Sequence, residues 1–164
     1  MKQLKTIFLF MFTLILLFNM TTMSSYAISA PPEITAPSGV LIDAATGDVL
    51  YEKNAREIMY PASTTKIMTA LLTLENADLD DLVVIDKDTP FTDGSRLYVI
   101  EGEIFTVEQL LYAIMVESAN DAAIALAKHI SGTVEDFSKL MNKRAKELGA
   151  KNTNFINQIG RAHV

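Results

Sequence analysis

The hydrophobic pattern opens with an apolar run over residues 7–18 that follows a short basic start. A polar stretch then leads to a small-x-small sequence that ends at Ala27. This order is typical of a secretory signal peptide, and the apolar run is short for a membrane span. We expect a signal peptide over residues 1–27 that is cleaved after Ala27, with Ala30 as the second choice and an uncleaved anchor as the alternative. The mature protein would then work outside the cytoplasmic membrane.

Short alternating segments follow a Pro-rich linker at residues 28–37. Residues 38–43 and 48–52 have the pattern of two strands, and residues 44–47 between them end in a glycine that suits a turn. The sequence therefore predicts a β-hairpin directly after the linker.

A helical pattern begins after Pro61, which ends any earlier helix. Ser63 is suited to cap the new helix, which we expect to run to about Glu75. Its apolar positions form one broad face: Ile67, Met68, Leu71, Leu72 and Leu74.

The middle of the chain has weaker patterns. Residues 82–85 and 97–100 are short apolar strand candidates, and residues 92–95 between them read as a turn. We find no strong chemistry in this part of the sequence.

Two further helices are predicted in succession. Thr106 and Gln109 have the form of a capping box, and this helix breaks at residues 117–121. An Ala-rich helix follows over residues 122–129 and stops at Gly132. The apolar face of the first helix consists of Leu110, Leu111, Ile114 and Met115.

The last predicted helix begins near Thr133 and ends at Gly149, which suits the position after a helix end. Its apolar residues recur at helical spacing: Phe137, Leu140, Met141, Ala145 and Leu148. An N-terminal hairpin with helices that carry most of the remaining pattern predicts an α+β fold.

Composition excludes several classes of function. The 164 residues contain no cysteine, so disulfides, thiolate metal sites and a thiol nucleophile are absent. The net charge is −6 and becomes −8 without Lys2 and Lys5, and no basic stripe points to a nucleic-acid partner. The histidines, His129 and His163, have no apparent partners, and no metal or cofactor motif occurs.

The strongest candidate chemistry is the pair Ser63 and Lys66, in the sequence S-x-x-K. A helix places residues at this spacing on one face. A serine hydroxyl needs a neighbouring base to become a good nucleophile, and a lysine whose pKa is lowered by burial can serve. Taken alone, the pattern also fits a capped helix with a surface lysine.

A second constellation is Ser118 and Asn120, in the sequence S-x-N. This spacing places two side chains on different faces of a helix, so they converge only in a loop or turn. Such a loop could orient a peptide and relay a proton. The alternative is a cap for the helix that follows.

Together these motifs resemble those of the serine-type D-alanyl-D-alanine carboxypeptidases, the low-molecular-mass penicillin-binding proteins. The likeness extends over longer blocks in the family's order: Ala62–Ala70, Gly94-Ser95, Gly102-Glu103, Ser118–Ala123 and Met141–Gly149. It covers residues 38–157, which we expect to be the N-terminal part of the catalytic domain. The resemblance implies a penicillin-binding-protein/β-lactamase-like transpeptidase fold, truncated, with an N-terminal β-hairpin and a helical subdomain.

The resemblance also implies roles for the four motif residues. Ser63 would attack the carbonyl between the two terminal D-alanines of a peptidoglycan stem peptide, with Lys66 as its base. Ser118 would assist proton transfer to the leaving amine, and Asn120 would bind the substrate backbone and help hold Lys66. β-Lactams would acylate Ser63. No cofactor or metal is implied.

The sequence also departs from the family. It has no Lys-Thr-Gly motif, and after Asn157 the family's Pro-x-Gly-Leu is replaced by a heptapeptide that resembles a translated sequencing adapter. We therefore expect residues 158–164 to be a non-native tail on a truncated gene model. The missing part would include the later strands and possible membrane association through a C-terminal segment. The fragment itself should be marginally folded and nearly inactive.

Three alternatives to the carboxypeptidase remain open. One is a β-lactamase of the same superfamily, and another is a non-enzymatic penicillin-sensing or wall-binding module. The third is a secreted helical domain in which the motifs occur by chance.

Overall fold

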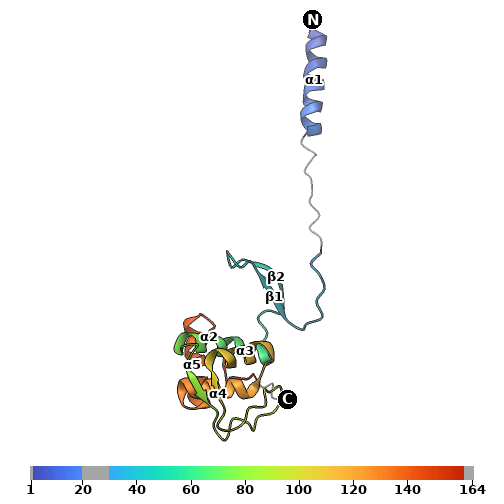
Figure 1. Cartoon of the computed structure of the whole chain (residues 1–164). Helices are drawn as coiled ribbons and strands as arrows, with labels where there is room; N and C mark the ends of the chain where they lie inside the picture. The colour runs from blue at the N-terminus through green and yellow to red at the C-terminus, as the bar shows by residue number, and fades with distance from the viewer. Residues whose placement is uncertain (1, 20–29, 161–164) are drawn as a thin grey trace. The chain divides into compact units, whose positions relative to one another are not determined.

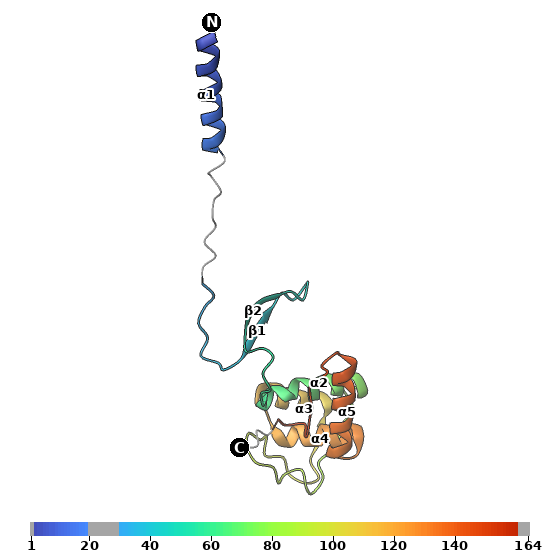
Figure 2. The same ribbon diagram turned by 180° about the vertical axis from the view of Figure 1, so that it is seen from behind.

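The computed structural model describes residues 2–19 and 30–160 of the chain. The chain divides into two compact units, residues 1–57 and residues 58–164, and each is described by itself. Figures 1 and 2 show the strands of the first unit and the helices of the second from two opposite sides.

The first unit begins with helix α1, Lys2–Asn19, which lies within the predicted signal peptide. The predicted cleavage position, Ala27, lies outside the described residues. Among the described helices, none has the length and apolar character required to cross a membrane. The signal peptide remains a prediction.

The predicted β-hairpin is confirmed. Strands β1 (Gly39–Ile42) and β2 (Val49–Lys53) pair antiparallel, with Gly39 opposite Lys53. Gly47 adopts a φ of 78°, a left-handed conformation that glycine tolerates best, so the turn forms without steric cost. More than half of the surface of each large apolar side chain on the two strands is exposed: Val40, Leu41, Ile42, Val49 and Leu50.

Over its described residues, 58–160, the second unit contains four α-helices and a two-stranded sheet. Its elements in chain order are the 3₁₀ turn η1 (Ala62–Thr65), α2 (Lys66–Asn76), β3 (Leu82–Val84), β4 (Ile104–Thr106), α3 (Val107–Val116), α4 (Asn120–Ser131) and α5 (Val134–Glu147). Helix α4 packs against α2, α3 and α5, so it is the central element of the unit (Figure 1). The predicted α+β class is confirmed.

Two apolar clusters form the core of this unit. The larger lies mainly on α3 and α4, and its members with no exposed surface are Val107, Leu110, Ala119, Ala122, Ala123 and Leu126. The smaller joins α2, α4 and α5 through Leu72, Ala127, Phe137 and Met141. Burying this apolar surface favours the helical packing, because each buried methylene contributes about 0.8 kcal/mol.

The strand predicted at residues 97–100 is wrong. The strand that pairs with β3 is β4, and Val84 of β3 lies opposite Ile104 of β4. The backbone N–H groups of Leu97 and Val99 instead donate to the carboxylate of Asp121, at 3.0 and 3.2 Å. A buried carboxylate thus takes the place of a neighbouring strand.

The predicted apolar face of α2 is wrong in part. Leu72 is buried, whereas Ile67 and Leu74 are about 60% exposed. Polar residues occupy much of the buried face instead, namely Lys66, Thr69 and Thr73. Threonine tolerates this burial because its hydroxyl donates to a main-chain carbonyl, as Thr73 does to Thr69 at 2.8 Å.

The predicted capping of α3 and α5 is confirmed. Thr106 and Gln109 form the capping box of α3, and the Thr133 side chain accepts from the N–H of Asp136 at the start of α5. Gly149 follows α5 with a φ of 88°, and the next N–H reaches back to Ala145 at 2.9 Å. The predicted burial of Met115 and Leu148 is wrong, since both are more than half exposed.

Candidate active site

Ser63 is the second residue of η1, one turn before α2. Its predicted capping role is wrong, because the cap position is Pro61 and no side chain caps this turn. The local carbonyl of Pro61 takes that role by accepting from the N–H of Thr64 at 3.1 Å. Ser63 is exposed, and its hydroxyl has no hydrogen-bond partner within the described ranges. The hydroxyl is therefore open to a ligand.

Lys66 is the first residue of α2, and only 2% of its surface is exposed. Burial lowers the pKa of Lys66 from its ordinary value of 10.5, because desolvation disfavours the ammonium form. A 3₁₀ turn has three residues per turn, so its geometry aligns the side chains of Ser63 and Lys66. The local fold thus supplies both an accessible hydroxyl and an amine that loses its proton more easily.

The amine of Lys66 donates to the carbonyl oxygen of Ile159 at 3.3 Å. The hydroxyl of Thr69, one turn further along α2, donates to the carbonyl of Gln158 at 2.8 Å. Both acceptors belong to the segment predicted to be non-native. They are main-chain atoms, so these bonds depend on the backbone path and not on the side chains at these two positions.

Gly160 completes this contact with a φ of 72°. A side chain there would overlap the carbonyl of Ala62, which leaves room for glycine alone. The position coincides with the glycine of the family's Pro-x-Gly-Leu. The non-native origin of residues 158–164 stays a prediction, and residues 161–164 lie outside the described residues.

Ser118 lies in the break between α3 and α4 with a φ of 56°, which is unfavourable for a residue with a side chain. Its Oγ atom is buried and has no hydrogen-bond partner among the described residues. A buried hydroxyl without a partner costs free energy, which makes Ser118 a candidate for a functional role.

Asn120 is the first residue of α4, so the predicted loop includes Ser118 but not Asn120. Its side-chain amide donates to the carbonyl of Asp93 at 2.6 Å, and its backbone N–H donates to Ser95 at 2.8 Å. The oxygen of the same amide accepts no hydrogen bond from the described residues. The amide is therefore anchored through one atom and available through the other.

The two motifs begin helices that pack against each other, α2 and α4. Ile159 contacts both neighbourhoods, since its carbonyl accepts from Lys66 and its side chain joins the buried cluster that contains Ala119. In chemical terms, this region combines an exposed hydroxyl, a desolvated amine, a buried second hydroxyl and an anchored amide. Such a set suits acyl transfer to a serine.

Asp121 is a site residue that the sequence motifs did not reveal. Its carboxylate is fully buried and accepts three backbone N–H groups, from Leu97, Val99 and Ala122. A single acidic residue within a run of small apolar residues is the signal that could have revealed it, because a buried carboxylate requires internal donors.

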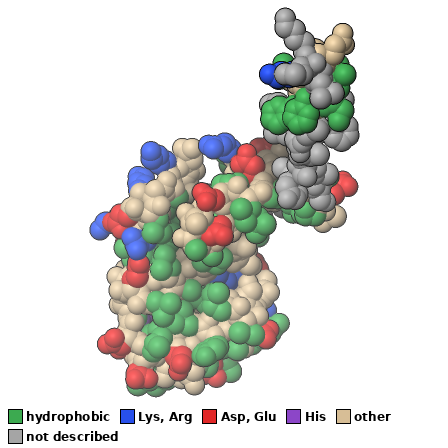
Figure 3. All heavy atoms as spheres, turned by 90° about the horizontal axis from the view of Figure 1, so that it is seen from above, with side chains coloured by type: hydrophobic (Ala, Val, Ile, Leu, Met, Phe, Trp, Pro, Cys, Tyr) green, Lys and Arg blue, Asp and Glu red, His purple; other side chains and the backbone are tan. Residues whose placement is uncertain are grey.

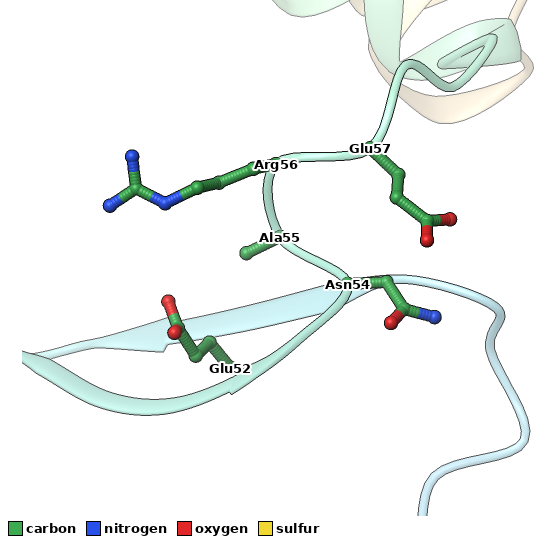
Figure 4. A pocket seen from close by; sticks show the side chains of 5 residues that line it. All are labelled: Glu52, Asn54, Ala55, Arg56 and Glu57. Carbon is green, nitrogen blue, oxygen red and sulfur yellow. The ribbon is translucent and has the colours of Figure 1, made fainter.

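The histidines and the pocket of the first unit contribute no residue to this site. His129 lies 3.7 Å from Asp81, so the prediction that it has no partner is wrong, and His163 lies outside the described residues. Figure 4 shows a pocket in the first unit that is lined by the exposed residues 52 and 54–57 and contains none of the motif residues. In the part of the chain that the structure describes, no cluster of acidic or histidine residues could hold a metal ion.

Comparison with known proteins agrees with this chemistry. Residues 25–163 match the family model described as D-alanyl-D-alanine carboxypeptidase. The D-alanyl-D-alanine carboxypeptidase DacF of Bacillus subtilis is 47% identical over 130 residues, which cover 76% of this chain and 33% of DacF.

Solved structures give the same result. The D-alanyl-D-alanine carboxypeptidase DacD from Francisella tularensis superposes with a TM-score of 0.77 at 40% identity, covering 82% of this chain and 34% of that one. Penicillin binding protein 5 from Haemophilus influenzae gives 0.75 at 36% identity, covering 82% and 41%. The fold is therefore that of the penicillin-binding proteins.

The chain spans about a third of the length of DacF and DacD. Within that span, the family match and the fold agree over most of the chain. The chain belongs to the D-alanyl-D-alanine carboxypeptidases, the serine enzymes also known as low-molecular-mass penicillin-binding proteins.

Proposed function

We propose that this chain is the N-terminal part of an exported serine carboxypeptidase that removes the terminal D-alanine from peptidoglycan stem peptides. The observation that carries the proposal is the buried Lys66, with its lowered pKa, one 3₁₀ turn from the exposed hydroxyl of Ser63. A buried lysine without an acidic partner is costly to keep, and a general base is a reason to keep one.

In the first step, the neutral amine of Lys66 takes the proton of Ser63 as Oγ attacks the carbonyl carbon between the two D-alanines. Negative charge develops on the carbonyl oxygen. The backbone N–H of Ser63 is one donor that can stabilise it. Collapse of the intermediate breaks the peptide bond and leaves an acyl-enzyme on Ser63.

The leaving D-alanine needs a proton on its amine, and the unpartnered hydroxyl of Ser118 is the group proposed to relay it. Asn120 would bind the substrate backbone through the amide oxygen that no described residue occupies. Water then releases the shortened peptide. A β-lactam offers a similar carbonyl and would acylate the same serine.

The complete gene product, meaning the full reading frame that contains this chain, is expected to carry the family's Lys-Thr-Gly motif. In the family this motif contacts the substrate carboxylate, and the backbone beside it completes the oxyanion hole. Export through residues 1–27 and association with the membrane through a later segment belong to the same proposal. The chain as given would have little turnover.

The test measures two reactions of the complete gene product side by side. We expect release of D-alanine from a peptide ending in D-Ala-D-Ala, slow hydrolysis of penicillin, and loss of both with Ser63→Ala. Rapid penicillin hydrolysis without D-alanine release would show a β-lactamase. Stable acylation without peptide turnover would show a penicillin sensor, and either result contradicts the proposal.

A further inference from the structure

Asp121 is the buried acidic residue that the proposed mechanism does not use. Its Oδ1 accepts from the N–H groups of Leu97 at 3.0 Å and Ala122 at 2.9 Å, and its Oδ2 accepts from Val99 at 3.2 Å. The donors at Leu97 and Val99 lie more than 20 residues away in sequence. The carboxylate thus fastens a distant segment to the first turn of α4.

This segment, residues 93–99, also contacts Asn120. The carbonyls of Asp93 and Ser95 accept from the side chain and the backbone of Asn120, at 2.6 and 2.8 Å. Within the segment, Tyr98 adopts a φ of 62°, an unfavourable conformation that persists only where neighbouring contacts hold the backbone. The contacts of Asp121 lie on both sides of Tyr98.

We propose that Asp121 is a positioning residue for Asn120: by holding residues 97 and 99, it fixes the carbonyl of Asp93 that anchors the Asn120 amide. This inference rests on the proposed function, because Asn120 matters only if it binds the substrate. Asp121 would touch no reacting atom. It would act by keeping one amide in the orientation that acylation requires.

A substitution at Gly94 would displace the same amide without altering Asp121. A Cβ atom there would lie 2.8 Å from Nδ2 of Asn120, so alanine would push the amide from the side of the segment. Gly102 is the matched control, since its φ of 85° equals that of Gly94 within a degree and nothing lies within 4 Å of its added Cβ. The two glycine variants therefore carry similar backbone strain and differ in the contact with Asn120.

The test is a double-mutant cycle on penicillin acylation of the complete gene product. Asp121→Asn replaces one carboxylate oxygen with an NH₂ group, which cannot accept a hydrogen bond. The NH₂ group then faces either the N–H of Val99 or the N–H groups of Leu97 and Ala122, depending on which oxygen it replaces. We expect acylation to slow about 10- to 100-fold. Asn120→Ala should cost at least as much. If Asp121 acts through Asn120, the double variant is no slower than Asn120→Ala alone, whereas a merely structural loss multiplies with it.

Asp86→Asn is the control for removing a carboxylate that accepts backbone N–H groups, because Asp86 accepts from Thr89 and Lys128 and from none of the motif residues in the described part of the chain. Its small effect should multiply with that of Asn120→Ala. Gly94→Ala should slow acylation by a similar factor to Asp121→Asn without adding to Asn120→Ala, while Gly102→Ala should leave the rate within about twofold. The glycine pair decides the question if Asp121→Asn does not fold.

The inference would be overturned if the loss from Asp121→Asn multiplied with that from Asn120→Ala, or if the two glycine variants had equal effects. Failure of the proposed function looks different. In that case the unaltered protein releases no D-alanine from the peptide, whether or not penicillin acylates it, and this result does not depend on any variant of the cycle.

Discussion

At the scale of single residues, the proposed chemistry of the S-x-x-K motif depends on how deeply each of its two residues is buried. Lys66 and Ser63 are separated by one 3₁₀ turn, yet one is buried and the other is exposed. Desolvation lowers the pKa of Lys66, and the exposed hydroxyl of Ser63 can meet a substrate. The spacing was readable in the sequence, but the burial of the lysine was not, because it depends on the chain that packs over α2.

The first prediction concerns the pH dependence of acylation. In the proposed mechanism the active form of Lys66 is the neutral amine, so the rate should rise with pH through a pKa that lies below 10.5. Lys66→Arg stays charged, and we expect it to lower the rate by about a thousandfold at every pH. Lys128→Arg, which alters a lysine paired with Asp86, should leave the profile in place. A wild-type rate that falls as pH rises through this range would contradict a lysine base.

The second prediction separates structure from chemistry at Ser118. Its Oγ makes no hydrogen bond among the described residues, and its φ of 56° suits glycine. Ser118→Gly should therefore keep the free energy of unfolding within about 1 kcal/mol of the wild type. It should slow acylation about 100-fold or more if the hydroxyl relays a proton. A large loss of stability with normal acylation would show a purely structural role.

At the scale of elements, the hairpin and the caps of α3 and α5 could be predicted, and the pairing of β3 could not. Caps such as Thr106 and Thr133 are local, so the sequence contains the whole signal. The partner of β3 depends on a distant carboxylate, Asp121, which holds residues 97 and 99 out of the sheet. Likewise, the polar inner face of α2 follows from the backbone carbonyls that Thr69 meets, which no local pattern records.

The third prediction concerns the capping box of α3. Thr106→Ala removes the acceptor for the N–H of Gln109, which lies 3.2 Å away, and should cost about 1 kcal/mol of stability. The measurement is urea unfolding of the complete gene product. Thr153→Ala is the control, since this threonine is exposed and outside any helix, and it should stay within about 0.5 kcal/mol. Equal losses in both variants would contradict the role of the cap.

At the scale of the whole molecule, exposed apolar surface is the dominant feature. Figure 3 shows hydrophobic side chains gathered on one face of the helical unit. Independently of the view, five large apolar side chains of α2 and α3 are more than half exposed, namely Ile67, Leu74, Tyr112, Met115 and Val116. The hairpin of the first unit also exposes its aliphatic residues. Large exposed apolar surfaces favour association with other chains or are buried by further parts of the same protein. The chain spans about a third of the length of DacF.

The fourth prediction follows from this surface and from the lack of the Lys-Thr-Gly motif. A polypeptide of residues 28–164 should be acylated by labelled penicillin at least about 100-fold more slowly than the complete gene product, because it lacks the Lys-Thr-Gly motif that we propose completes the oxyanion hole. Its circular dichroism should show a broad thermal transition. Acylation of both proteins at similar rates would mean that these residues suffice.

The most direct test of the central claim locates the acyl group itself. The complete gene product is treated with penicillin and digested, and the peptides are identified by mass spectrometry. We predict the penicilloyl mass on the peptide that contains Ser63, and no adduct in Ser63→Ala. An adduct on another residue, or continued acylation of the alanine variant, would contradict Ser63 as the nucleophile.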